Sequence, residues 1–292
     1  MLRTRIVTAV VLLLGLLAAL FFLPTLAWAG FCALICALAA WEWGGLAGWG
    51  RKERVVYGIV SGCLCFVPVF LLWLQGLGSP GISTGGVGPL LSEESILLFL
   101  GSLFLFSAIF WLLIVPLWLR CKWALHGWVA AVVGTIVLVP STLAFIGIRE
   151  ISPLGLLTVC GLVWVADIAA YLSGRTFGGI KLAPSISPGK TWAGAIGAVI
   201  GVLVYVNVIV FVVEFGKSRI IEENPLMLQL VIIGLTAWSI IGDLFESLLK
   251  RHAGVKDSSN LLPGHGGILD RIDSLTSTMA LIGSSVFLGF LF

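Results

Sequence analysis

Long apolar runs separated by short polar segments make up most of the chain. Runs of about 20 apolar residues have the length that a helix needs to cross the hydrocarbon core of a bilayer. Lipid offers the backbone no hydrogen-bond partners, so each run is expected to be α-helical. The nine predicted helices cover residues 6–23, 26–45, 56–75, 95–118, 127–148, 154–173, 192–214, 226–246 and 275–292. The pattern therefore predicts an all-α polytopic integral membrane protein with about nine transmembrane helices.

Composition supports this interpretation. Hydrophobic residues make up 59% of the 292 positions and charged residues only 11%, which is more apolar surface than a soluble core can bury. The first apolar run follows a basic start, and no small-residue cleavage site follows it, so we expect a retained helix instead of a removed signal. The helices show no internal repeat. We predict one integral membrane domain over residues 1–292.

Basic residues are distributed unevenly between the two ends of the predicted helices. One end collects most of the 17 lysines and arginines: Arg3, Arg5, Arg51, Lys52, Arg54, Arg120, Lys122, Arg175, Lys181, Lys190, Lys250, Arg251, Lys256 and Arg271. The other end has Arg149, Lys217 and Arg219. Because short cytoplasmic loops retain Lys and Arg, we predict a cytoplasmic N-terminus and cytoplasmic loops after the second, fourth, sixth and eighth helices. The C-terminus is then expected outside.

Two of these cytoplasmic loops, residues 176–191 and 250–273, follow helices that contain acidic residues. Asp167 lies within the sixth predicted helix and Asp243 near the end of the eighth. A carboxylate at membrane depth costs about 2.5–3.5 kcal/mol on insertion scales, so it is expected to have a cation, a partner or a water-filled cavity. Asp167 could alternatively form a hydrogen bond between helices, and Asp243 could belong to a polar helix end.

The first loop ends in SPGKT, which resembles the end of a P-loop. That motif needs a glycine at position 184, where this chain has Pro184, so a P-loop is excluded. Lys190 and Thr191 are still predicted at the start of a helix, where free N–H groups and the helix dipole favour a phosphate. Ser185 and Ser187 add further donors. The alternative is a turn with ordinary cytoplasmic positive charge.

The second loop begins on a helix with a mixed polar face. At helical spacing Asp243, Ser247 and Lys250 share one face, and Glu246 and Lys250 form an i, i+4 pair. Acidic and basic side chains are thus predicted to be close together where the eighth helix ends.

The end of the second loop reads PGHGGILDRID. Its glycines allow a close approach of the backbone, and Asp270 and Asp273 are three apart at the expected start of the ninth helix. Together with Asp243 they would bring carboxylates from two helices to one place, which suits a hard cation such as Mg²⁺ that also binds phosphate oxygens. His265, beside the glycines, could donate to a phosphate or to the backbone.

These loops resemble the signature of the phosphatidate cytidylyltransferases, also called CDP-diacylglycerol synthases. The matching positions are Ser247, Leu249, Lys250, Arg251, Lys256, Asp257, Ser259, Leu262, Pro263, His265, Gly266, Gly267, Ile268, Asp270, Arg271, Ile272 and Asp273. The resemblance extends to Asp167, Ala170, Tyr171, Gly174 and residues 181–194, and more loosely to residues 39–48. It is weak over the third to fifth helices.

The resemblance implies transfer of the cytidylyl group of CTP to phosphatidate, which gives CDP-diacylglycerol and pyrophosphate for phospholipid synthesis. The attacking oxygen is already anionic, so no strong general base is expected. The implied setting is the cytoplasmic face of the inner membrane, with the catalytic part at about residues 160–275. The expected partners are CTP, phosphatidate and membrane lipid, not nucleic acid, and a homodimer is compatible with this chemistry.

Residue roles follow from the loops and the resemblance together. Lys250, Asp243 and Asp270 are predicted to be catalytic. Mg²⁺ is predicted on Asp243, Asp270 and Asp273, with Asp167 as a further candidate ligand and K⁺ as the candidate for a second cation. The predicted substrate-binding residues are Ser187, Lys190, Thr191, Ser247, Arg251, Lys256, Asp257, His265, Gly266, Gly267 and Arg271.

Two other functions fit part of the pattern. A CTP-dependent kinase acting on a polyprenol or another lipid would transfer the γ-phosphate and leave CDP. An ion-coupled transporter would also place acids at membrane depth, but it would not need Lys, His, Gly and Asp clustered in one cytoplasmic loop.

Overall fold

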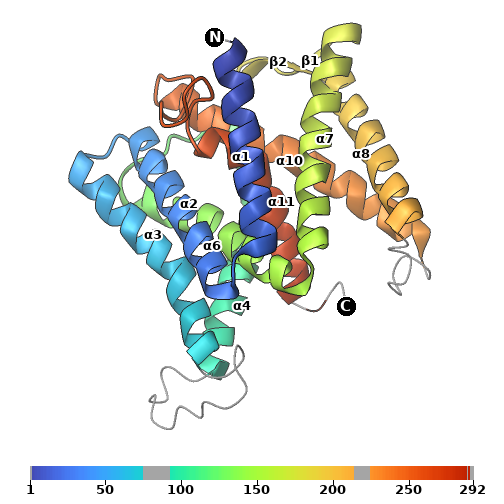
Figure 1. Ribbon diagram of the computed structural model, residues 1–292. Helices are drawn as coiled ribbons and strands as arrows, with labels where there is room; N and C mark the ends of the chain where they lie inside the picture. The colour runs from blue at the N-terminus through green and yellow to red at the C-terminus, as the bar shows by residue number, and fades with distance from the viewer. Residues whose placement is uncertain (1, 75–92, 214–223, 288, 290–292) are drawn as a thin grey trace.

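The computed structural model describes residues 2–74, 93–213, 224–287 and 289, and these residues are almost entirely helical (Figure 1). The helices are α1 (Leu2–Phe22), α2 (Thr25–Leu46), α3 (Arg51–Leu72), α4 (Glu93–Ile109), the π-helical segment η3 (Phe110–Ile114), α5 (Val115–Cys121), α6 (Gly127–Ile151), α7 (Pro153–Phe177), α8 (Trp192–Val213), α10 (Pro225–His252) and α11 (Leu269–Phe287). Two short strands, β1 (Lys181–Ala183) and β2 (Ser187–Thr191), lie between α7 and α8. The prediction of an all-α polytopic membrane protein is confirmed.

Seven helical segments among the described residues are long and apolar enough to cross a membrane. They are α2, α3, the continuous segment from α4 to α5, α6, α7, α8 and α10. The other two predicted regions are also helical. However, the apolar part of α1 is shorter, and α11 does not meet the same criterion. The end of the ninth predicted helix also includes residues outside the described ranges. The count of nine spans therefore stays a prediction.

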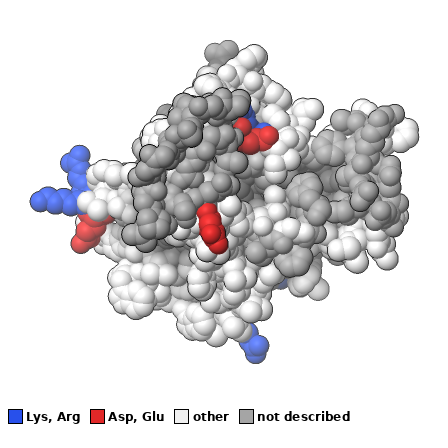
Figure 2. Space-filling view, turned by 90° about the horizontal axis from the view of Figure 1, so that it is seen from below, with Lys and Arg blue, Asp and Glu red and all other residues white. Residues whose placement is uncertain are grey.

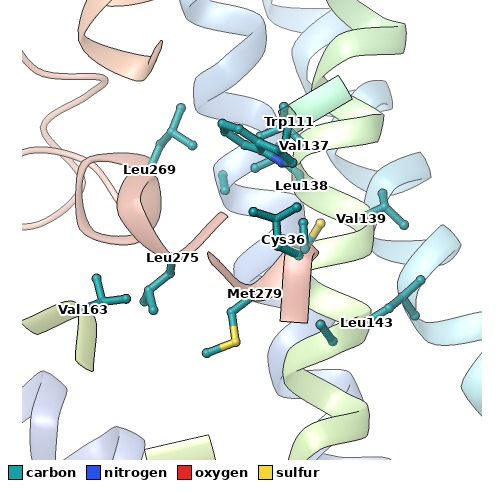
Figure 3. Packing of buried hydrophobic residues seen from close by; sticks show 14 of the residues in the cluster. Cys36, Trp111, Val137, Leu138, Val139, Leu143, Val163, Leu269, Leu275 and Met279 are labelled. Carbon is teal, nitrogen blue, oxygen red and sulfur yellow. The ribbon is translucent and has the colours of Figure 1, made fainter. Parts of the chain in front are cut away.

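Helices far apart in sequence surround a common core. Side chains from α2, η3, α6, α7 and α11 meet there, and Figure 3 shows Trp111, Leu138 and Met279 among them. Trp111 and Met279 are fully buried. This packing joins the N-terminal helices to α11, which carries two of the predicted site carboxylates.

Aromatic side chains attach α10 to this core. The ring of Phe245 on α10 makes edge-to-face contacts with Phe110, Trp111 and Trp118, at centroid distances of 5.8 Å in each case. Such arrangements match the quadrupoles of the rings. Because Phe245 lies between Asp243 and Glu246 in sequence, its anchoring sets the position of the acidic part of α10.

The loop predicted at residues 176–191 contains an antiparallel hairpin. Lys181 pairs with Thr191, and Ala183 pairs with Ser187. Lys190 and Thr191 therefore lie in β2 and not in the following helix, which begins at Trp192. The Thr191 hydroxyl accepts a hydrogen bond from the Gly194 amide at 3.1 Å, so Thr191 caps α8.

The second predicted loop is shorter than expected. Helix α10 continues to His252 instead of ending near residue 246, and α11 begins at Leu269 instead of residue 275. Lys250 and Arg251 are thus helical, and residues 253–268 form the connection, which we call the α10–α11 loop. Burial of the apolar face of α10 beside the core accounts for its extra length, since Leu248 and Leu249 are each 2% exposed.

The two ends of the molecule differ. Figure 1 places the start of α1, the hairpin and the α10–α11 loop at one end, and the α6–α7 junction and the end of α11 at the other. Seen from that other end, the described surface shows only a few charged side chains (Figure 2). The structure thus agrees with the uneven distribution of charge that the sequence predicts. The assignment of the hairpin end to the cytoplasm remains a prediction.

Candidate active site

A first ion pair joins the hairpin to α10. Lys190 Nζ on β2 lies 2.6 Å from Asp243 Oδ2, and the Ser247 hydroxyl donates to Asp243 Oδ1 at 3.1 Å. The Lys190 and Asp243 side chains are 22% and 29% exposed. This pair is therefore accessible enough for a ligand to compete for either partner.

A second cluster places one lysine between two acids. Lys250 Nζ donates to Glu246 Oε2 at 2.7 Å and to Asp270 Oδ1 at 2.6 Å. The i, i+4 pair predicted between Glu246 and Lys250 is confirmed. The three side chains are between 4% and 11% exposed. Water therefore solvates these charges poorly, and each charge is stabilised mainly by its oppositely charged partners.

The second carboxylate oxygen of Asp270 holds the α10–α11 loop. Oδ2 lies 2.8 Å from the Ser258 amide, 2.9 Å from the Ser258 hydroxyl and 2.8 Å from the Gly267 amide. Burial alone would raise the pKa of Asp270, but the hydrogen bonds from Lys250 and from these amides hold the pKa below its ordinary value. Asp270 therefore stays ionised at neutral pH.

Negative charge is crowded around the first turn of α11. Burial, followed by the nearby charges of Asp243 and Glu246, raises the pKa of Asp273 well above its ordinary value. The Oε1 atom of Glu246 is buried and has no hydrogen-bond partner among the described residues. Asp167 is exposed on α7, and its charge interacts with Asp243, Lys190 and Arg271.

The acids have the chemistry of a Mg²⁺ site but are not arranged as one in this structure. Within the described ranges, no group of three or more His, Cys, Asp or Glu side chains could hold a metal ion. Lysines instead occupy the positions next to Asp243 and Asp270 that a cation would take. The unpartnered Glu246 Oε1 and the crowding around Asp273 nevertheless fit a hard cation, because carboxylate oxygens are its preferred ligands.

A polar cavity lies beside Asp270. Its volume is about 580 Å³, and several of the predicted substrate-binding residues line it. The lining residues are Lys256, Asp257, Asn260, Leu262, Pro263, Gly264, His265, Gly266 and Arg271. Five predicted residues, Lys256, Asp257, His265, Gly266 and Arg271, are therefore brought to one cavity.

The glycine-rich part of the loop forms a tight turn at this cavity. The Leu262 amide donates to the Gly266 carbonyl at 2.8 Å, and Gly264 and Gly266 adopt φ angles of 75° and 79°. Positive φ is readily available to glycine. His265 Nδ1 is buried without a partner among the described residues, and Arg271 Nε donates to the His265 carbonyl at 3.1 Å.

Three other predicted residues make contacts that position the hairpin. Ser187 is paired with Ala183 in the sheet, Thr191 caps α8, and Arg251 Nε donates to the Ile186 carbonyl at 3.4 Å. Gly267 donates to Asp270 and is buried. The structure thus places these residues around two groups of direct contacts, in which Asp243 contacts Lys190 and Ser247, and Asp270 contacts Lys250.

Two residues at this site, Ser258 and Glu42, have no role predicted from the sequence. Ser258 contacts Asp270 through both its amide and its hydroxyl, and Glu42 on α2 accepts hydrogen bonds from the same loop. A glutamate within an apolar helix was a signal for Glu42, since a buried carboxylate needs partners. No local pattern indicates Ser258, because its partner is twelve residues away.

Comparison with known proteins covers almost the whole chain. The model of the family described as "Cytidylyltransferase family" matches residues 3–288. The chain is 36% identical over 288 residues to the phosphatidate cytidylyltransferase of Pseudomonas aeruginosa, covering 96% of this chain and 94% of the relative. It is 34% identical over 295 residues to the phosphatidate cytidylyltransferase of Haemophilus influenzae, covering 96% of each protein. A relative of that name from Brucella suis is 43% identical over 164 residues, which are 54% of this chain and 56% of the relative.

Proposed function

The chain belongs to the cytidylyltransferase family, and from that premise we propose that it transfers the cytidylyl group of CTP to phosphatidate. The products are CDP-diacylglycerol and pyrophosphate. One observation carries the proposal: Lys190 pairs with Asp243 and Lys250 pairs with Asp270, and Asp270 packs against Gly266 in the lining of a polar cavity at one end of the protein. A nucleotide reaches this end from water, while the lipid approaches from the bilayer.

The reaction joins two polyanions. A phosphate oxygen of phosphatidate attacks the α-phosphorus of CTP, and the bond from that phosphorus to the bridging oxygen of the β-phosphate breaks. Pyrophosphate leaves with the electron pair. The attacking oxygen carries a negative charge at neutral pH, so the residues have to offset charge and orient the groups, not remove a proton.

Lys190 and Lys250 are the side chains suited to hold phosphates. In the structure they pair with Asp243 and Asp270, each at 2.6 Å. A triphosphate brings more negative charge than a carboxylate, and an ammonium group can rotate its donors toward it. Transfer of the lysines to phosphate oxygens would also free the carboxylates.

Mg²⁺ is the proposed cofactor. Asp243 and Asp270 would hold it, with Asp273 in or next to its first shell and Asp167 nearby, and K⁺ is the candidate for a second cation. When bound, Mg²⁺ offsets negative charge on the phosphates of CTP. The support is the oxygen chemistry of these side chains and the unpartnered Glu246 Oε1 beside them.

The polar cavity is proposed as the nucleotide site. Lys256 and Arg271 contribute positive charge to it, and the turn at Gly264 and Gly266 allows a ligand to approach the backbone. We place this site on the cytoplasmic face of the inner membrane, because most basic residues gather at this end.

Product analysis tests the proposed function. Purified protein is incubated with CTP, phosphatidate and Mg²⁺, and the nucleotide and lipid products are identified. We expect pyrophosphate and CDP-diacylglycerol in equal amounts, dependent on phosphatidate. Formation of CDP with a newly phosphorylated lipid would instead identify the kinase alternative.

A further inference from the structure

Glu42 is a fully buried carboxylate on α2, far in sequence from the predicted site. Its side chain is 0% exposed, and an isolated carboxylate at such a position would be strongly unfavourable. Four hydrogen-bond donors surround it. Oε1 accepts from the Ser259 hydroxyl at 2.6 Å and the Ile268 amide at 3.0 Å. Oε2 accepts from the Ser258 hydroxyl at 3.0 Å and the Leu269 amide at 2.7 Å.

These donors come from both ends of one segment. Ser258 and Ser259 precede the cavity-lining turn, while Ile268 and Leu269 follow it at the start of α11. The first amides of a helix have no partners within the helix, and the helix dipole favours a negative charge beside them. Glu42 therefore fastens both ends of residues 258–269 to α2, and the segment between them lines the cavity.

The same contacts connect Glu42 to Asp270. The Ser258 hydroxyl lies 3.0 Å from Glu42 Oε2 and 2.9 Å from Asp270 Oδ2, and its single hydrogen can be donated to only one of them at a time. A Cβ atom on Gly267 would lie 2.5 Å from Glu42 Oε2, so the backbone there passes directly against the carboxylate. The position of Asp270, and of Lys250 beside it, thus depends on Glu42.

We propose that Glu42 is a positioning residue for nucleotide binding. It does not contact substrate but holds the α10–α11 loop so that the cavity and Asp270 keep their geometry. This inference rests on the assignment of the cavity to the nucleotide. A carboxylate is required, because each of its oxygens accepts two hydrogen bonds, whereas the NH₂ group of a glutamine would face two donors.

The test is Glu42→Gln, with Glu53→Gln as the matched control. Glu53 lies on α3, where it accepts one exposed hydrogen bond from the Gly50 amide. We expect Glu42→Gln to raise KM for CTP about tenfold to a hundredfold, as loss of positioning does, with KM for phosphatidate nearly unchanged. Amide hydrogen exchange over residues 258–269 should be faster than in the wild type and in Glu53→Gln. An effect on folding alone would lower the yield of active protein at an unchanged KM for CTP.

A second variant covers the case in which Glu42→Gln does not fold. Ser259→Ala removes one donor from Glu42 Oε1 and the acceptor of the Leu261 amide, and leaves the other three contacts of Glu42. It should raise KM for CTP by a smaller factor and speed exchange at Ile268. Where both variants fold, the double variant should change the free energy of CTP binding by less than the sum of the two single changes. Both substitutions act through the same contact, between Ser259 and Glu42.

Unchanged KM for CTP and unchanged loop exchange in either folded variant would overturn the proposal. Hydrogen exchange needs no substrate, so it reports on Glu42 even if the protein forms no CDP-diacylglycerol. Absence of that product in the wild type would count against the proposed function. Normal loop exchange in Glu42→Gln would count against the positioning role.

Discussion

At the scale of single residues, Lys250 is the cation that balances two buried acids. Removing it leaves Glu246 and Asp270 facing each other without a positive charge. Breaking a buried ion pair from one side typically costs about 3–5 kcal/mol. The same residue is proposed to bind phosphate, so its substitution has two separable effects.

We predict that Lys250→Ala lowers both thermal stability and turnover, the latter by orders of magnitude. The double variant Lys250→Ala with Glu246→Gln removes one of the two unbalanced charges and should recover part of the lost stability. It should not recover turnover. Thermal unfolding in detergent and initial rates at saturating CTP measure the two effects, and near-normal kcat in either variant would assign Lys250 to structure alone.

The proposed metal ligands lead to a second prediction. Asp243→Asn and Asp270→Asn keep the shape of the side chain and remove its charge, so both should abolish turnover. Asp167→Asn should reduce turnover less, since Asp167 is exposed on α7 and lies outside the contacts that join Asp243 and Asp270 to lysines. Titration of activity with Mg²⁺ provides the measurement. An Asp270→Asn enzyme with the turnover and Mg²⁺ requirement of the wild type would exclude this ligand.

The predicted contact that the structure confirms at this scale is a local one. Glu246 and Lys250 are one helical turn apart, so spacing alone brings them together. The contacts of Asp270 with Ser258 and of Glu42 with Leu269 depend on how the loop folds and on which helices pack. Hydrophobic pattern carries no information on either.

At the scale of elements, close packing of α7 and α8 sets the position of the hairpin between them. A Cβ atom on Gly194 would lie 2.9 Å from the Ala170 carbonyl oxygen, so the two helices approach through a residue without a side chain, as membrane helices often do. β2 leads directly into α8 and carries Lys190.

We therefore predict that Gly194→Ala destabilises the protein by about 1–3 kcal/mol, the usual cost of overpacking, and lowers turnover by displacing Lys190. Gly234→Ala on α10 is the control, because a Cβ atom there would meet nothing within 4 Å. It should leave stability unchanged or slightly increase it, since alanine favours helix. Equal melting temperatures for the two variants would contradict this account of the α7–α8 contact.

The hairpin itself was not predicted. Its strands have three and five residues, and β2 contains Pro188 and Gly189, both unfavourable in strands. The pairing of Lys181 with Thr191 offsets this low strand propensity only when the end of α7 and the start of α8 are held together. By contrast, the long apolar helices were predicted well, because lipid leaves the backbone few alternatives.

At the scale of the whole molecule, topology is the main prediction. Cysteines placed at positions 190 and 256 should react with an impermeant thiol reagent only from the cytoplasmic side, and a cysteine at position 217 only from outside. Of the native cysteines, Cys63 and Cys121 are exposed and need replacement, while the other four are buried. Labelling of position 256 from outside would reverse the proposed orientation.

Only 11% of the residues are charged, and the uneven distribution of these residues brings reactive side chains to one end of the protein. Its helices are apolar, as membrane-spanning helices are, and the sequence predicts that most of its cations lie at one end, where Lys190 and Lys250 contact Asp243 and Asp270. Sequence analysis could identify these residues by type and by resemblance. It could not predict that Lys190 contacts Asp243 and that Lys250 contacts Asp270.

Transfer of label from CTP to lipid tests the central claim most directly. Purified protein, phosphatidate and Mg²⁺ are incubated with CTP that carries ³²P at either the α- or the γ-phosphate, and radioactivity is measured in the extracted lipid. The account predicts that α-label enters the lipid as CDP-diacylglycerol and that γ-label is recovered in pyrophosphate. Entry of γ-label into the lipid, or no transfer of either label with phosphatidate present, would contradict it.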